Sequence, residues 1–170
     1  MEVTEKQDNL EGPRASMDTE SESRRKVYCF GNADLEEDSI PLDLAEELDE
    51  DPELKGRFCF IRCTSPDFLL NLSVKEADDI IIIDTVKGLD SVEVIEDLDR
   101  LKDTKTTTAH DFDLGTVLKL MKEAGEIRRV IVIGVPDTLK SGIKGMVRAE
   151  LLRERSKNTP EAKNVKKDDA

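Results

Sequence analysis

Three separated segments of the chain carry side chains that together could hold a divalent metal ion. An acid-rich segment, residues 31–39, follows the first apolar run, Asp84 directly follows four isoleucines, and His110 is the only histidine in the chain. Carboxylate oxygens and an imidazole nitrogen form a mixed ligand set for divalent transition metals. Three protein ligands leave coordination positions open, which metal-assisted hydrolysis requires. The residue types therefore favour such a site if the fold brings the segments together.

Each of these residues also has an ordinary structural interpretation. An acid just before a helix commonly caps it or interacts favourably with the helix dipole. A polar residue that ends a strand is common, and a lone histidine in a loop more often faces solvent than binds a metal. Residue type and spacing alone therefore leave both interpretations open.

The elements that must position these residues can be predicted from apolar patterning. Apolar or alternating runs predict strands at 26–30, 57–62, 79–84, 91–95 and 130–133. Helical spacing predicts helices at 40–48, 67–75, 114–124 and 138–155. We expect Ser39 to cap the first helix, Pro41 to take its first helical position, and Met146 to face inward in the last.

Strands that alternate with helices predict an α/β fold, a three-layer α/β/α sandwich of the phosphorylase/hydrolase-like type. Its sheet is expected to be twisted, five-stranded and mainly parallel, with one antiparallel edge strand. Ligands of open α/β sheets bind outside the carboxyl ends of the strands. The segment after 26–30, Asp84 and the loop around His110 are therefore expected at one edge of the sheet.

Composition limits the possible partners and compartment. The net charge is −13, from 26 Lys and Arg against 39 Asp and Glu, which disfavours nucleic acid or an anionic membrane as partner. No apolar run approaches the roughly 20 residues of a membrane span, and the first residues do not resemble a signal peptide. Three cysteines, expected to be reduced and buried, favour a cytoplasmic location.

The ends of the chain differ in composition from its centre. Residues 1–25 are predicted to be a disordered acidic extension, and 157–170 a flexible charged tail. The folded domain is therefore expected at 26–156. The sequence contains no feature that indicates the oligomeric state.

Five short motifs follow one another along residues 26–152. They are an apolar run ending in Gly31-Asn32 with the acidic pair Glu37-Asp38 before a helix, Cys63-Thr64-Ser65, Asp84 followed by Thr85-Val86, Thr108-Ala109-His110 before Leu114-Gly115, and an apolar run ending in Gly134-Val135-Pro136. In this order they resemble the nickel–iron hydrogenase maturation endopeptidases, of which the chain would be a divergent member.

The resemblance implies a hydrolase that removes a C-terminal extension from the large-subunit precursor of a hydrogenase after nickel insertion. By position, Asp38, Asp84 and His110 would recognise the nickel and act as the catalytic residues of an aspartic-type or nickel-dependent endopeptidase. The nickel would arrive on cysteines of the substrate and would not be permanently bound. Further contacts with the substrate are expected from Gly31, Asn32, Glu37 and Thr64.

One departure from the family pattern leaves an alternative open. Glycines usually flank the acidic pair in this family, whereas residues 36–41 contain none. The alternative is a catalytically inactive homologue that binds the precursor as an adaptor. A nucleotide or small-anion site at the same turn ranks lower, because Gly31 stands alone and acids crowd the turn.

Overall fold

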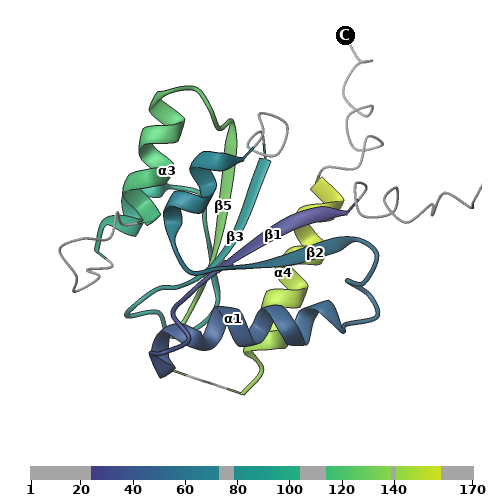
Figure 1. Ribbon diagram of the computed structural model, residues 1–170. Helices are drawn as coiled ribbons and strands as arrows, with labels where there is room; N and C mark the ends of the chain where they lie inside the picture. Colours follow the sequence, from purple (N-terminus) through teal and green to yellow (C-terminus); the bar gives the residue numbers. More distant parts are fainter. Residues whose placement is uncertain (1–23, 73–78, 104–113, 139–140, 158–170) are drawn as a thin grey trace, which may run out of the picture.

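A five-stranded sheet lies between two helical layers in the computed structural model, which describes residues 24–72, 79–103, 114–138 and 141–157 (Figure 1). The strand order is β2-β1-β3-β5-β4. All neighbours are parallel except β4, which pairs antiparallel with β5 at the edge. The strands are β1 Arg25–Phe30, β2 Phe58–Cys63, β3 Asp79–Thr85, β4 Glu93–Ile95 and β5 Arg129–Val135. The predicted α/β fold with one antiparallel edge strand is confirmed.

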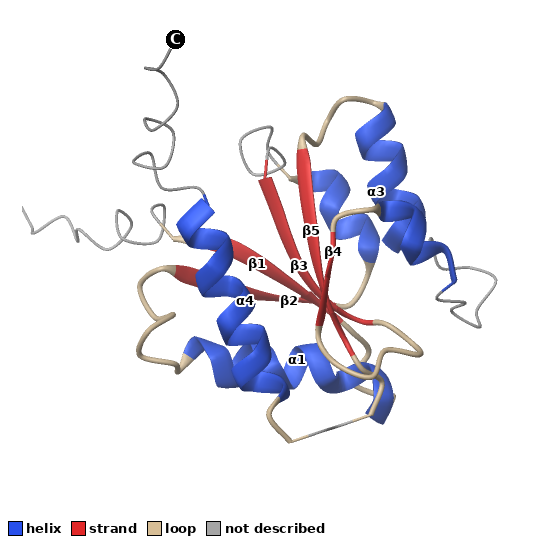
Figure 2. Ribbon diagram, turned by 180° about the vertical axis from the view of Figure 1, so that it is seen from behind, coloured by secondary structure: helices blue, strands red, loops and turns tan. Residues whose placement is uncertain are grey.

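The helices cover the two faces of this sheet. On one face lie α1 (Glu36–Asp49) and α4 (Ile143–Lys157), and on the other lie α3 (Leu114–Glu123) and two 3₁₀ helices (Figure 2). The 3₁₀ helices are η1 (Pro66–Asn71) and η2 (Leu98–Asp103). No helix within the described ranges combines the length and hydropathy that a membrane span requires.

Alternating side chains of β3 build both halves of the core. Ile80 and Ile82 pack on the face of α3, whereas Ile81 and Ile83 pack on the face of α1 and α4. All four isoleucines are fully buried. A continuous β-branched run is typical of a central parallel strand covered on both faces.

The connections reverse direction between β1 and β3. From β1 the chain passes through α1 to β2 on one side, and from β3 it continues to β4 and β5 on the other. A ligand site in an open α/β sheet lies at such a switch point, outside the carboxyl ends of the strands. The turn after β1 and the end of β3 therefore border the expected crevice.

The start of α1 differs from the prediction. The helix begins at Glu36 after Leu35, and neither Ser39 nor any other side chain caps it. The backbone N–H groups of Asp38 and Ser39 both donate to the Leu35 carbonyl, at 2.9 and 2.8 Å, so the turn after β1 continues directly into the helix. Pro41 consequently lies inside α1, and the acidic pair belongs to the first helical turn.

Other local expectations also need correction. The described part of the predicted helix at 67–75 is the 3₁₀ helix η1, which follows Ser65 and buries Leu69 while Leu70 remains 57% exposed. Residues 73–75 lie outside the described residues. Met146 is 46% exposed because the inward stripe of α4 is formed by Ile143, Val147 and Leu151. That helix begins five residues later than predicted, directly after Gly142, whose φ of 92° ends the preceding turn.

The cysteines agree with the expectation of reduced thiols, but the expected burial holds for only two of them. All three are unpaired, with Cys29 and Cys63 buried and Cys59 half-buried. Burial, together with the charge of Cys63, raises the pKa of Cys29 far above its usual range, and burial raises the pKa of Cys63 to about 11. Both buried thiols are therefore protonated at neutral pH.

Candidate functional site

The turn after β1 is held against the first turn of α1. The backbone N–H of Asn32 donates to the Asp38 carbonyl at 3.1 Å, and the Asn32 Oδ1 accepts from the Asp34 N–H at 3.0 Å. The Gly31 N–H donates to the Cys63 carbonyl at the end of β2, at 3.1 Å. The Gly31-Asn32 dipeptide therefore shapes the turn that carries the acidic pair.

Asp38 is the better enclosed carboxylate of that pair. Its residue is half-buried, whereas Glu37 is exposed. Burial and, to a smaller extent, the charge of Glu37 raise the pKa of Asp38, against the opposing influence of the Asn32 backbone hydrogen bond and the charge of Lys87.

Asp84 lies at the carboxyl end of β3, one residue before the last. It is half-buried and stands beside Gly134 of β5. The alternation of β3 directs Asp84 to the same face as Ile80 and Ile82, against which α3 packs. His110, the third predicted ligand, lies outside the described residues, four positions before the start of α3.

A hydrogen bond links the backbone segments that carry the two carboxylates. Thr85, next to Asp84, donates its hydroxyl to the backbone carbonyl of Glu37, next to Asp38, at 3.4 Å. Pro41 has no N–H, so the Glu37 carbonyl lacks its usual helical partner four residues later. The carboxyl end of β3 is thereby joined to the first turn of α1.

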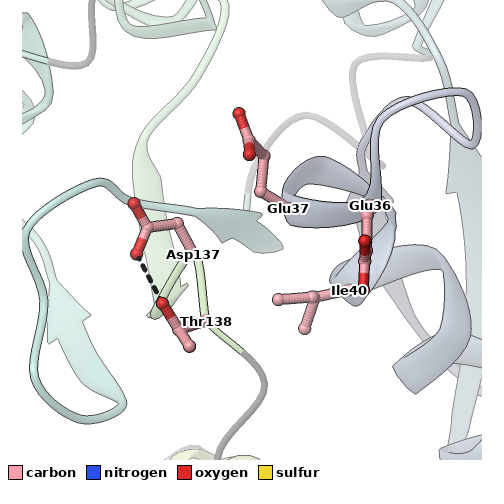
Figure 3. Close-up of a pocket in the computed structure, with 5 residues that line it drawn as sticks. All are labelled: Glu36, Glu37, Ile40, Asp137 and Thr138. Atoms are coloured by element: carbon pink, nitrogen blue, oxygen red, sulfur yellow. Dashed lines mark hydrogen bonds between the residues drawn. The ribbon is translucent and has the colours of Figure 1, made fainter.

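A pocket of about 170 Å³ opens beside the first turn of α1. Figure 3 shows Glu36, Glu37 and Ile40 on one side and Asp137 with Thr138 on the other. Asp137 and Thr138 follow β5, and the Thr138 hydroxyl contacts the Asp137 carboxylate at 3.4 Å. Neither residue was predicted to belong to the site, although Gly134-Val135-Pro136 marked the end of a predicted strand directly before them.

The remaining predicted contact residue lies at the same edge of the sheet. Thr64 is exposed directly after β2, whose last residue accepts the Gly31 hydrogen bond. In the parts of the chain that the structure describes, no cluster of three or more His, Cys, Asp or Glu residues could hold a metal ion. Two of the three predicted ligands, Asp38 and Asp84, lie in these parts.

These groups can perform a limited set of chemical tasks. Carboxylates bind divalent cations, accept hydrogen bonds and act as general bases when ionised. A carboxylate whose pKa is raised by burial, as that of Asp38 is, takes up a proton more readily than an exposed one. The carboxylates at this edge of the sheet, Asp38 in the first turn of α1 and Asp84 near the end of β3, can therefore transfer protons and bind a metal ion through oxygen.

Known structures share this fold. The hydrogenase maturating endopeptidase HybD from E. coli matches with a TM-score of 0.57 and 18% identity, over 79% of this chain and 94% of that chain. The endopeptidase HycI from Escherichia coli matches with a TM-score of 0.57 and 22% identity, over 80% and 92% of the two chains. A [NiFe] hydrogenase maturation protease HycI from Thermococcus kodakarensis KOD1 reaches 0.50 and 19%, over 80% and 94%.

Family membership rests on the sequence model. A search of curated proteins returned no match. The model of the HycI hydrogenase maturation proteases matches residues 42–157, more than half of the chain. This range includes Asp84 and His110 and begins four residues after Asp38. The chain therefore belongs to the hydrogenase maturation protease family.

Proposed function

We propose that the protein is an endopeptidase that removes a C-terminal extension from a nickel-loaded [NiFe]-hydrogenase large-subunit precursor. Membership of the maturation protease family supports peptidase activity. Asp38, Asp84 and His110 are the residues proposed to recognise the nickel and to act in cleavage. The proposed compartment is the cytoplasm, in keeping with three free thiols.

The observation that carries this proposal is the hydrogen bond from Thr85 to the Glu37 carbonyl. It joins the residue after Asp84 to the residue before Asp38, although these segments are far apart in the sequence. Asp84 faces the side of the sheet on which α3 packs, and His110 precedes α3 by four residues. The two carboxylates that the structure describes are thus linked at the switch point.

The chemistry of the substrate explains why this ligand set suits recognition. Nickel held by substrate thiolates already has soft ligands, and carboxylate oxygens with an imidazole complete its coordination without competing for the thiolates. Cleavage then depends on correct metal loading. We propose that Glu37 and Thr64, both exposed at this edge, contact the substrate, and that Gly31 and Asn32 contribute by shaping the turn.

The test is cleavage of purified precursor, nickel-loaded or nickel-free, followed by mass spectrometry. We expect the wild-type protein to shorten the nickel-loaded precursor much faster than the nickel-free precursor. Asp38→Asn, Asp84→Asn and His110→Ala should each lower the rate at least about 10-fold, the lower bound for disturbing a metal environment. Asp49→Asn removes the same charge from the exposed end of α1 and serves as the control.

Two results would contradict the proposal. Cleavage that ignores nickel would remove the recognition role of the three residues. Equal cleavage by wild-type protein and His110→Ala would remove the role of the imidazole.

One observation favours a second function, that of a non-catalytic adaptor for the precursor. Residues 36–41, where the family pattern has flexible glycines, form regular helix with an internal proline. Such a segment allows less close approach of a substrate backbone than glycines do. A stable, salt-sensitive complex with intact nickel-loaded precursor, without truncation, would favour this alternative.

A further inference from the structure

We propose that Thr85 is a positioning residue that sets the placement of Asp38 relative to Asp84, and that Pro41 makes its contact possible. This inference rests on the proposed function, in which the two carboxylates act on one metal. Thr85 and Pro41 themselves are assigned no contact with metal or substrate. Three features of the hydrogen bond from Thr85 to the Glu37 carbonyl support this role: its acceptor, its donor and its position relative to the two carboxylates.

The acceptor of this bond is a helix carbonyl without its usual partner. In an α-helix the carbonyl of residue 37 receives the N–H of residue 41. Pro41 lies inside α1 and has no N–H, and its ring also crowds that carbonyl. The Glu37 carbonyl is therefore available to a donor from outside the helix.

The donor of this bond is held by the sheet. Thr85 is only 9% exposed and is the last residue of β3. Its backbone is fixed by pairing with Val135, and the next N–H, that of Val86, donates to the Val135 carbonyl at 2.9 Å. The hydroxyl thus projects from a rigid part of the sheet to the Glu37 carbonyl at 3.4 Å.

The position of this bond relates the two carboxylates. On β3, Thr85 faces α1 and Asp84 faces the α3 side, because successive side chains alternate. On α1, Asp38 directly follows Glu37. This hydrogen bond therefore relates the two acids across the switch point, because it joins residues 48 positions apart in the sequence.

The experiment uses the full chain with Thr85→Val, which keeps the shape and removes the hydroxyl, and Thr85→Ser, which keeps the hydroxyl. Thr116→Val, on the exposed side of α3, is the matched control. The first readout is the separation of the Asp38 and Asp84 carboxyl carbons in crystal structures of the variants. We expect Thr85→Val to change this separation, and Thr85→Ser and Thr116→Val to leave it unchanged.

The second readout is the ratio of cleavage rates for nickel-loaded and nickel-free precursor, measured well below the unfolding temperature. Thr85→Val should lower this ratio about 10-fold, the scale on which groups around metal ligands act. Thr85→Ser should keep a ratio close to that of wild type. A loss of general stability alone would lower both rates and leave their ratio unchanged.

Pro41→Ala provides an independent check. It returns an N–H that can bond to the Glu37 carbonyl within the helix. Thr85→Val should then change the separation of Asp38 and Asp84 less in the Pro41→Ala background than in the wild-type background. Equal changes in both backgrounds would overturn the role given to Pro41.

The outcomes separate the two proposals. If wild-type protein does not discriminate between the precursors while Thr85→Val still moves Asp38 relative to Asp84, the proposed function fails and the positioning role stands. If Thr85→Val changes neither the separation of the two carboxylates nor the ratio of cleavage rates, the positioning role is overturned and the proposed function is unaffected.

Discussion

Gly31 approaches Asp38 so closely that a side chain at Gly31 would collide with the backbone. A Cβ at Gly31 would lie 2.2 Å from the Asp38 carbonyl oxygen. That oxygen accepts the Asn32 N–H, so the turn cannot move away without losing a hydrogen bond. The glycine of the Gly-Asn motif is therefore required by packing in this protein.

We expect Gly31→Ala to lower the free energy of unfolding by about 2–3 kcal/mol, the upper range for overpacking. Urea unfolding followed by circular dichroism measures this change. Gly145→Ala is the control, because Gly145 lies in α4 and a Cβ there would meet no other residue within 4 Å. That substitution should be neutral or stabilise the protein by up to about 1 kcal/mol. Equal effects at both positions would contradict the packing argument.

A charged pair at the opposite edge of the sheet contributes to stability and should not affect the site. Glu154 of α4 is 1% exposed and accepts a hydrogen bond from Arg129 at 2.8 Å, at the start of β5. Removing one partner of a buried pair leaves the other charge poorly compensated. We expect Arg129→Met to lower the free energy of unfolding by roughly 2 kcal/mol, less than for a fully buried pair because Arg129 is partly exposed.

Arg153→Met is the matched control for this prediction. Arg153 pairs with Glu150 on the exposed side of α4, and such pairs contribute at most about 0.5 kcal/mol. Urea midpoints at pH 7 compare the two variants. A loss of similar size in both would show that burial of Glu154 does not matter.

The pKa of Asp38 predicts a pH-dependent effect on stability. Burial raises this pKa in the folded protein, so the folded state binds the proton more tightly than the unfolded chain does. The ionised carboxylate therefore costs stability at neutral pH, and this cost disappears as the pH falls through the folded pKa toward the unfolded value. Asp38→Asn should thus stabilise the protein at pH 7, by less than about 1 kcal/mol because the half-exposed group is screened by solvent.

The measurement compares urea midpoints of wild type and Asp38→Asn at pH 7 and pH 4. The advantage of the variant should shrink toward the lower pH. Asp49→Asn, at the end of the same helix, controls for the loss of one negative charge. An advantage that grew as the pH fell would show that the pKa is lowered instead.

The two buried thiols should resist alkylation. With the pKa of Cys63 at about 11, roughly one molecule in a thousand carries the thiolate at pH 8. We expect iodoacetamide to modify Cys63 about 100-fold more slowly in the folded protein than in urea, and Cys29 still more slowly. Peptide mass spectrometry at timed intervals tests this. Rapid modification of Cys63 in the native protein would contradict the burial argument.

Patterns within single segments predicted most of the elements. The isoleucine run 80–83 predicted β3, and the spacing of apolar residues predicted α3 within one residue at its end. The beginning of α1 could not be predicted in this way. Ser39 and Pro41 have the local properties of a helix start, yet backbone hydrogen bonds to Leu35 begin the helix earlier.

For the candidate site, the sequence supplied the residue types and, through the family motifs, their order along the chain. It identified Asp84 as the polar end of a buried strand, because an abrupt change from apolar to polar residues is visible within a few positions. The strand order, the fit of Gly31 against Asp38, and the hydrogen bond from Thr85 to Glu37 became visible only in the folded protein. Hydrophobic periodicity is a local property, whereas contacts between distant segments depend on how the layers pack, and no single segment encodes that packing.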